Sequence, residues 1–199
     1  MFEVAEYIGI IAFAISGFFV AVRNKLDLLG ILVATFLTAL GGGIIRDIAV
    51  DKVPYTFSHD YPAIIVIGVL VLLVIFKFHK KQSIENKPLF ILSDSIGLVS
   101  FSITGALIAM EHHFNLTGIL ALSFITAVGG GIVRDVIINE IPFIFKTGFY
   151  GTVSLLVGLL VYGLDLYGLL SYFSLGIIFA FGVFLRVIAY YKKWRVLVL

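Results

Sequence analysis

The sequence predicts an all-α integral membrane protein with seven transmembrane helices, arranged as two inverted three-helix repeats plus a C-terminal seventh helix. The 199-residue chain is 61% hydrophobic and 13% charged, whereas a typical soluble domain is about 45–50% apolar and about 25% charged. Its apolar runs are long enough to cross a bilayer, which takes roughly 17–25 residues. The chain also aligns with itself at an offset of 88 residues without a gap.

The composition also limits the partners and the chemistry. A soluble domain of this size could not hide so much apolar surface, so lipid is the expected solvent. The chain contains no cysteine, which excludes disulfides, thiolate metal sites and a cysteine nucleophile. A formal net charge of +2 is too small to indicate a nucleic-acid partner. Glu3 and Glu6 precede the first apolar run where a cleaved signal peptide would carry Lys or Arg, so we expect a retained helix.

The spans divide into two groups of three and one extra helix within a single membrane domain, residues 1–199. We expect the first repeat over residues 4–78 and the second over residues 89–164. The seventh helix, residues 168–190, has no counterpart. The breaks between the apolar runs hold charged residues or turn formers. The expected spans are Val4–Val22, Leu28–Val50, Tyr61–Phe78, Leu89–Met110, Leu116–Ile138, Gly148–Leu164 and Gly168–Tyr190.

The charges between the spans indicate an orientation, because Lys and Arg concentrate on cytoplasmic loops. One face carries most of the basic residues: Arg23, Lys25, Lys77, Lys80, Lys81, Lys87, Lys146, Lys192, Lys193 and Arg195. The opposite face carries one basic residue with several acids: Lys52, Glu3, Glu6, Asp51, Asp60, Glu111 and Asp165. We therefore expect a multi-pass protein of the cell (inner) membrane with its N-terminus outside and its C-terminus in the cytoplasm.

The internal repeat includes the most polar segments of the chain. The offset of 88 places Gly41-Gly42-Gly43-Ile44-Ile45-Arg46-Asp47 on Gly129-Gly130-Gly131-Ile132-Val133-Arg134-Asp135. It also places Pro54 on Pro142 and Glu6 on Asp94. Each copy holds an odd number of helices, so the second copy crosses the membrane in the opposite sense. Inverted repeats of this kind are common in secondary transporters, where the pathway lies at the repeat interface.

The two glycine triplets are the sharpest local feature. They comprise Gly41, Gly42 and Gly43 in the second span and Gly129, Gly130 and Gly131 in the fifth. Each glycine costs about 1 kcal/mol in a helix relative to alanine, so a triplet favours a kink or an unwound stretch. Freed carbonyls would then partly replace the hydration shell of an ion. The alternative is that the glycines allow close helix packing.

Hydroxyl groups share a helix face with the middle glycine and the arginine of each triplet segment. In the second span this face carries Thr35, Thr38, Gly42 and Arg46. In the fifth it carries Ser123, Thr126, Gly130 and Arg134. Such a stripe can be wetted and so indicates an ion pathway. The alternative is that the hydroxyls bond back to carbonyls of their own helices.

The pairs Arg46-Asp47 and Arg134-Asp135 are costly to place in a membrane. We interpret them as two charged vestibules, one at each end of a single pathway. The alternative is structural anchoring, because each pair lies about one turn from a helix end and arginine can extend to water. Adjacent helix positions point about 100° apart, so we expect no direct pairing within each dipeptide.

Asp94 is a further candidate, about one turn into the fourth span. It could receive a cation or pair with an arginine of the other repeat, or lie in headgroup water, where an acid suits the start of a helix. His112 and His113 have no partner at ligand spacing, so we expect no metal site and no cofactor. No nucleophile elbow, zinc signature or phosphate-binding loop occurs, so we expect no enzyme.

With its duplicated glycine-triplet, Arg-Asp and proline elements, the chain resembles the prokaryotic TRIC (trimeric intracellular cation) channels over essentially its whole length. The resemblance implies a homotrimer in which each protomer holds a pore for monovalent cations such as potassium. It also implies that Gly41–Gly43 and Gly129–Gly131 kink the second and fifth helices beside the pore. A related bacterial family with this repeat is described as a glycine transporter, so the resemblance leaves channel and carrier open.

The residues themselves favour the channel. A carrier for a small neutral amino acid such as glycine needs partners for both the carboxylate and the ammonium group. Half-helix N-termini near the glycines could hold the carboxylate, but we expect no acidic residue at the depth of the bilayer midplane. Hydroxyls, carbonyls and a few charges would bind cations moderately, without a rigid carbonyl filter, so modest selectivity is expected. A membrane scaffold would leave the duplicated polar stripe unexplained.

Overall fold

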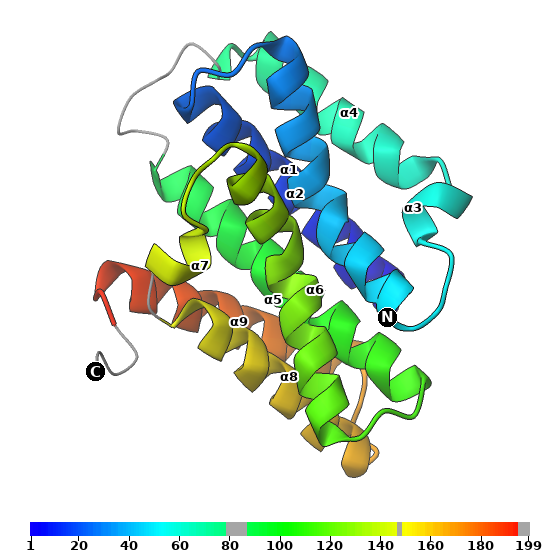
Figure 1. Ribbon diagram of the computed structural model, residues 1–199. Helices are drawn as coiled ribbons and strands as arrows, with labels where there is room; N and C mark the ends of the chain where they lie inside the picture. Colours follow the sequence, from blue (N-terminus) through cyan, green and yellow to red (C-terminus); the bar gives the residue numbers. More distant parts are fainter. Residues whose placement is uncertain (79–86, 147–148, 195–199) are drawn as a thin grey trace.

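The protein is described by a computed structural model that covers residues 1–78, 87–146 and 149–194. These ranges form a bundle of helices (Figure 1). The helices are α1 (Phe2–Arg23), α2 (Leu28–Ala49), α3 (Tyr55–Ser58), α4 (Tyr61–Ile75), α5 (Lys87–Glu111), α6 (Leu116–Ile137), α7 (Phe143–Lys146), α8 (Tyr150–Leu166) and α9 (Tyr172–Tyr191). By length and composition α1, α2, α5, α6 and α9 can each cross a membrane, and α4 and α8 are shorter apolar helices.

The seven predicted spans correspond to α1, α2, α4, α5, α6, α8 and α9. The expected start of the sixth span, Gly148, and several basic residues of the charge pattern lie outside the described residues. The short helices α3 and α7 were not predicted, because four residues after a proline give no periodic signal. They lie on opposite sides of the bundle (Figure 1), as an inverted repeat requires.

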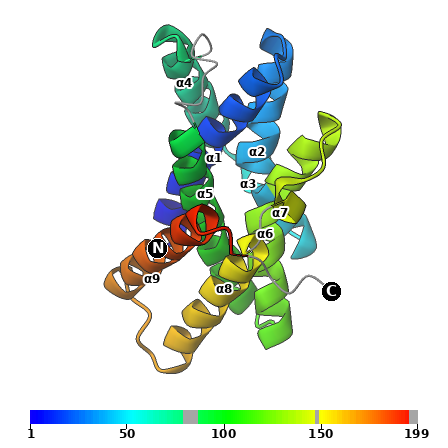
Figure 2. The same ribbon diagram turned by 90° about the vertical axis from the view of Figure 1, so that its left-hand side faces the viewer.

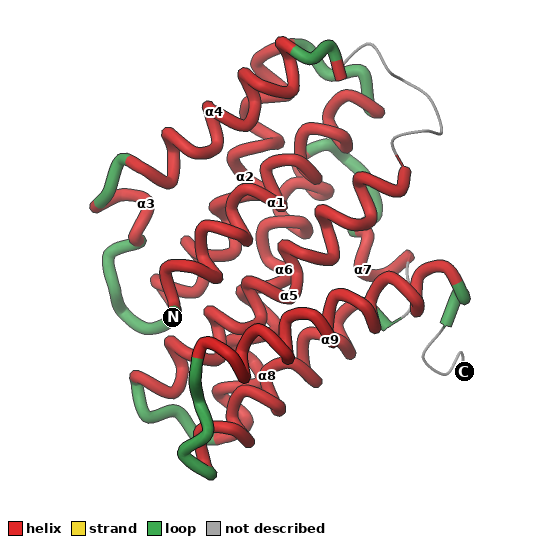
Figure 3. The backbone as a smooth tube through the Cα atoms, turned by 180° about the vertical axis from the view of Figure 1, so that it is seen from behind, coloured by secondary structure: helices red, strands yellow, loops and turns green. Residues whose placement is uncertain are grey.

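The repeat extends to the backbone of the connections, which lie at the ends of the bundle (Figure 3). Asp27 caps α2 by accepting from the Gly30 amide at 2.7 Å, and Asn115 caps α6 by accepting from the Gly118 amide at 2.9 Å. The residue two positions before each cap has a left-handed backbone, with φ 54° at Lys25 and 56° at His113. The two copies therefore share turns and caps as well as helices.

The first helix of each repeat lies deepest in the bundle. Within an 18-residue apolar stretch of each helix, 67% is buried in α1 and 83% in α5, against 28% in α9. Phe13 of α1 and Phe101 of α5 meet edge to face, with ring centroids 5.2 Å apart. A Cβ on Gly97 would lie 2.3 Å from the Phe13 ring, and one on Gly9 would lie 2.7 Å from the Phe101 ring. Each repeat thus supplies the glycine against which the other repeat packs its phenylalanine.

Helix α9 packs beside α8 on one side of the bundle (Figure 2). It also packs against α5. It exposes the large apolar side chains Phe173, Ile177, Phe181 and Phe184. In a membrane protein such a face contacts lipid or another subunit.

Candidate ion pathway

The two glycine triplets form the crossing between α2 and α6. A Cβ on Gly42 would lie 2.1 Å from the Thr126 carbonyl oxygen, and one on Gly130 would lie 2.5 Å from the Thr38 carbonyl oxygen. Because any side chain at these two positions would overlap backbone, the helices can approach this closely only with glycine. The crossing is symmetric, since the offset of 88 exchanges its two halves.

The expectation of an unwound stretch is wrong in this structure. Helix α2 runs from Leu28 to Ala49 and α6 from Leu116 to Ile137, both without interruption through the triplets. The glycines are accommodated because their missing side chains are replaced by the backbone of the opposite helix. Close contacts from glycine Cα–H groups to carbonyl oxygens are a common feature of such crossings. The packing alternative therefore describes the structure better than the broken-helix interpretation.

The hydroxyl stripe is dry in this conformation, because Thr35, Thr38, Ser123 and Thr126 are fully buried. The three threonines donate to carbonyls of their own helices: Thr35 to Ile31 at 2.7 Å, Thr38 to Ala34 at 2.6 Å and Thr126 to Leu122 at 2.6 Å. Ser123 instead donates to the carbonyls of Ser102 and Ser154 on neighbouring helices, at 2.9 and 3.3 Å. The Thr38 hydroxyl lies against Gly17 of α1 and the Thr126 hydroxyl against Gly105 of α5, so a water-filled path along these hydroxyls requires α2 and α6 to move away from those helices.

In the first repeat, Arg46 is buried and held by two carboxylates. Its Nη1 donates to Glu6 Oε2 at 2.7 Å and its Nη2 to Glu6 Oε1 at 3.2 Å. Its Nε donates to Asp47 Oδ1 at 2.8 Å, while Asp47 Oδ2 accepts from the Tyr55 amide at the start of α3. A buried cation with two hydrogen-bonded carboxylates is well compensated.

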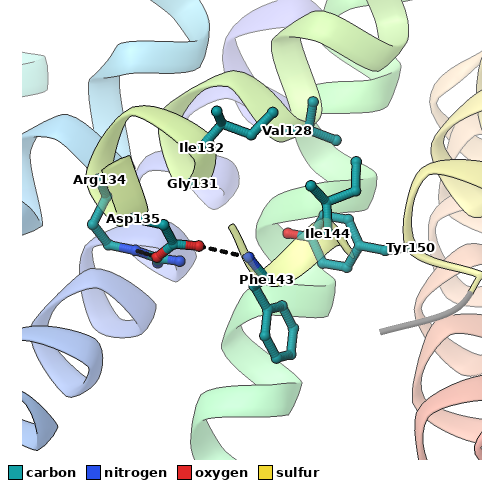
Figure 4. Close-up of a pocket in the computed structure, with 8 residues that line it drawn as sticks. All are labelled: Val128, Gly131, Ile132, Arg134, Asp135, Phe143, Ile144 and Tyr150. Carbon is teal, nitrogen blue, oxygen red and sulfur yellow. Dashed lines mark hydrogen bonds and ion pairs between the residues drawn. The ribbon is translucent and has the colours of Figure 1, made fainter. Parts of the chain in front are cut away.

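The expectation that each arginine and its neighbouring aspartate do not pair is also wrong. Arg46 pairs with Asp47, and Arg134 Nε donates to Asp135 Oδ1 at 2.8 Å. The long arginine side chain curls around the helix to reach the carboxylate. That carboxylate is fixed by an amide beyond the helix end, which for Asp135 is the Phe143 amide at 2.7 Å (Figure 4).

Among the described residues of the second repeat, no ion pair joins the acid to the arginine as Glu6 joins Arg46 in the first repeat. Asp94 takes the place of Glu6 but is one methylene shorter, and no hydrogen bond joins it to Arg134 in the described chain. Its Oδ1 accepts from Ser16 of the first repeat at 3.3 Å. Among the described residues, Asp94 Oδ2 and Arg134 Nη1 are buried without a hydrogen-bond partner.

Two of the interpretations offered for Asp94 are therefore wrong. The carboxylate does not lie in headgroup water, because Asp94 is buried seven residues after the start of α5. Its partner from the other repeat is the Ser16 hydroxyl and not an arginine. A cation at Asp94 stays a prediction.

Arg186 of α9 belongs to the same buried group as Asp94, Arg134 and Asp135, which we call the second cluster. Sequence reasoning did not foresee that Arg186 takes part in it. Arg186 is fully buried, and its guanidinium carbon lies 4.7 Å from the centroid of the Tyr150 ring. Arg186 and Arg134 both attract the Asp94 carboxylate electrostatically. The signal was present in the sequence, because an arginine inside a membrane span rarely lacks a role, and Arg186 precedes the end of α9 by five residues.

A cavity of about 100 Å³ opens beside the second cluster. It is lined by Val20, Arg23, Phe90, Arg134, Asp135, Glu140, Ile141, Phe143 and Lys146. A second space of about 10 Å³, enough for about one water molecule, lies between Arg134, Asp135 and Tyr150 (Figure 4). The charged pair Arg134-Asp135 can thus be approached from its own end of the bundle.

Glu140 forms part of the wall of the larger cavity and is held by two cations. Lys146 donates to its Oε2 at 2.9 Å and Arg23 Nη2 to its Oε1 at 3.2 Å. The hydrogen bond from Lys146 and the charge of Arg23 hold the pKa of Glu140 below its usual value. Among the described residues, no group of three or more His, Cys, Asp or Glu is placed to hold a metal ion.

Comparison with known proteins assigns the family. The family model described as "Glycine transporter" matches residues 3–78 and again residues 91–166. The UPF0126 membrane protein YvgT of Bacillus subtilis (strain 168) is 35% identical over 97% of this chain and 94% of its own length. The UPF0126 inner membrane protein YadS of Escherichia coli (strain K12) is 34% identical over 77% of this chain and 74% of its own. The chain therefore belongs to the family that this model describes, together with these UPF0126 proteins.

Solved structures connect the family to TRIC channels. A chain from work on the structural basis for conductance through TRIC cation channels is 34% identical, with TM-score 0.84, over 100% of this chain and 97% of that chain. A prokaryotic TRIC channel crystallised in 0.5 M KCl is 30% identical, with TM-score 0.88, over 98% of each chain. The TRIC trimeric intracellular cation channel orthologue from Rhodobacter sphaeroides is 27% identical, with TM-score 0.87, over 97% and 98%. The predicted resemblance is confirmed, and the chain has the TRIC fold.

Proposed function

We propose that this UPF0126 protein is a potassium-permeable monovalent cation channel with its pathway between the two repeats, along α2 and α6. The observation that carries the proposal is the full-length likeness to TRIC cation channels at 30–34% identity. The symmetric glycine crossing supports it, because helices that meet through backbone at Gly42 and Gly130 can separate there without removing interlocked side chains. The carbonyls of Thr38 and Thr126, which face the crossing, would then line the opened path.

Buried arginines beside the pathway would repel cations unless neighbouring acids compensate their charge. Arg46 lies against Glu6 and Asp47, so this end of the pathway carries one net negative charge. At the other end Arg134 and Arg186 face Asp94 and Asp135, and the four charges cancel. Neither end presents an uncompensated cation to an entering potassium ion. Moderate binding of this kind suits conduction with modest selectivity.

We further propose a homotrimer with one pore in each protomer, and an N-terminus outside the cell. The trimer is supported by the TRIC orthologue described as trimeric. The exposed apolar face of α9 is consistent with a subunit contact. The orientation rests on the excess of basic residues at the Arg23 end of the bundle.

Transport of a small neutral amino acid such as glycine is the second candidate, and one observation favours it. Asp94 Oδ2 and Arg134 Nη1 are both buried and unpartnered among the described residues. A carboxylate and a guanidinium in one repeat are the partners that an ammonium and a carboxylate would require. This weakens the expectation that no acid is available to a zwitterionic substrate.

Flux into liposomes separates the two candidates. Purified protein is reconstituted, and uptake of rubidium-86 and of labelled glycine is measured in the same preparation. The channel predicts fast rubidium uptake that does not saturate at millimolar concentrations and glycine uptake equal to that of empty liposomes. Saturable glycine uptake without rubidium flux would contradict the proposal and favour the carrier.

A further inference from the structure

Two groups of ion pairs join the repeats at opposite ends of the bundle. The first, the Glu140 clamp, consists of Arg23, Glu140 and Lys146, in which Glu140 accepts from both cations. The second, the Glu111 clamp, consists of Lys52 and Glu111, with Nζ and Oε1 3.4 Å apart. In each clamp, a residue at the end of the first helix of one repeat contacts the connection after the second helix of the other.

The two clamps occupy equivalent positions with their charges exchanged. The offset of 88 places Arg23 on Glu111 and Lys52 on Glu140. It places Ser58 on Lys146, so the Glu111 clamp has a neutral residue where the Glu140 clamp has its second cation. The same inter-repeat contact is therefore made twice, by an arginine–glutamate pair at one end and a glutamate–lysine pair at the other.

The clamps differ in strength. The Glu140 side chain is 25% exposed and accepts from two cations at 2.9 and 3.2 Å. The Glu111 side chain is 63% exposed and meets one lysine at 3.4 Å. Exposed single ion pairs contribute little because water and salt screen them, whereas a less exposed network contributes more. The Glu140 clamp therefore holds its end of the interface more firmly.

The contacts also lie where they can oppose opening. The Gly42–Gly130 crossing of α2 and α6 is buried where the two repeats meet, so opening a path along it requires movement between the repeats. Both clamps cross that interface, and Glu140 also lines the cavity that reaches Arg134. Separation of the repeats at this end would pull Arg23 away from Glu140.

We propose that the Glu140 clamp is a latch that favours the packed, non-conducting arrangement, and that the Glu111 clamp is its weaker counterpart. Only one consequence of this inference, the change in the ratio of open to closed time, rests on the proposed channel function. The structural consequence is that loss of the Glu140 clamp exposes buried residues of the crossing more often. The two consequences can be measured separately.

The test compares Glu140→Gln with Glu111→Gln as a matched control. An exposed ion-pair network of this size predicts an increase of about two- to fivefold in the ratio of open to closed time for Glu140→Gln. Glu111→Gln should increase the ratio by less. The triple variant R23E/E140K/K146S gives the Glu140 end the single ion pair of the weaker Glu111 end, so its ratio should lie between those of wild type and Glu140→Gln and closer to that of Glu140→Gln.

A chemical readout keeps the test independent of conduction. The chain has no cysteine, so Thr35→Cys introduces a single thiol at a buried position of α2, seven residues before Gly42. Its rate of reaction with a small cationic methanethiosulfonate in proteoliposomes should rise about two- to fivefold when combined with Glu140→Gln. The thiol that Ser58→Cys introduces at an exposed position should react at the same rate with and without Glu140→Gln.

The outcomes are distinct. Faster labelling at position 35 without current in any variant would support the latch and contradict the channel. Unchanged labelling and unchanged open time for Glu140→Gln would overturn the latch while leaving the channel intact. Equal effects of Glu140→Gln and Glu111→Gln would overturn the inequality of the two clamps.

Discussion

The two charged clusters stand at equivalent positions in the repeats but are completed differently. In the first repeat, Glu6 reaches Arg46 with both carboxylate oxygens. In the second, the shorter Asp94 leaves that contact unmade, and Arg186 and Tyr150 from α9 and α8 fill the surroundings. The comparison shows that a duplicated backbone tolerates unequal electrostatics, because a single methylene decides whether an acid and an arginine meet. The closed cluster stabilises the fold, and the open one lies beside a cavity.

The largest expected effect comes from breaking the closed cluster. Glu6→Gln removes one of the two carboxylates that compensate the buried Arg46, so we expect a loss of about 3–5 kcal/mol in the free energy of unfolding. Asp94→Asn, at the equivalent position, should cost less, about 1–3 kcal/mol, because Asp94 makes no hydrogen bond to an arginine and only its attraction to Arg134 and Arg186 and its bond to Ser16 are affected. Urea unfolding in detergent, followed by circular dichroism, measures both. Equal losses would contradict the asymmetry.

The glycine crossing should respond equally in both halves. Gly42→Ala and Gly130→Ala each force a methyl group into a backbone oxygen, so each should destabilise the protein by about 3 kcal/mol, the upper part of the range for overpacking. Gly68→Ala is the control, because a Cβ there meets no atom within 4 Å. It should be neutral or stabilising by up to about 1 kcal/mol. Thermal unfolding in detergent checks the order. An innocuous Gly42→Ala variant would show that the crossing is looser than described.

A longer acid should make the second cluster resemble the first. Asp94→Glu lets the carboxylate approach Arg134 Nη1, which has no partner among the described residues. A new charge-assisted hydrogen bond should raise stability by about 1 kcal/mol, or about 2–4 °C in Tm for a chain of this size. Glu6→Asp should lower Tm. A decrease in Tm for Asp94→Glu would mean that the space beside Arg134 cannot accept the extra methylene.

The smallest expected effect is a response to acid at the Glu140 clamp. Arg23 and Lys146 face this carboxylate, Asn24 also hydrogen-bonds to it, and Arg134 and Asp135 line the same cavity. Because its pKa is lowered in the folded protein, the clamp contributes fully above the ordinary pKa of 4.5 and is lost as pH falls through the lowered value. Solvent screening keeps the contribution below about 1 kcal/mol. Open time should therefore rise only below about pH 4.5, and Glu140→Gln should abolish this rise.

Much of the architecture could be predicted because it depends on composition and periodicity. The seven helices follow from runs of apolar residues, and the inversion follows from an odd number of helices in a gapless repeat. The short helices α3 and α7 could not be predicted, because four residues after a proline carry no period. Their function is nevertheless clear in the structure, where their first amides hold Asp47 and Asp135.

The side-chain arrangement of the candidate site was harder to predict. The helical wheel separates Arg46 from Asp47, but a flexible arginine side chain overrides that angle. The glycine triplets predict either a broken helix or a close crossing, and only the position of the opposite helix decides between them. The partnership of Glu6 and Arg46 was within reach, because both belong to the repeated pattern. Arg186 was missed because the seventh helix has no repeat partner to draw attention to it.

The most direct test of the channel is planar-bilayer recording of the purified protein in asymmetric potassium chloride. The proposed pathway predicts discrete unitary currents that reverse near the potassium equilibrium potential and do not change when glycine is added. Currents that reverse near the chloride equilibrium potential, or a silent bilayer from protein that takes up glycine in liposomes, would contradict a cation pathway between the repeats.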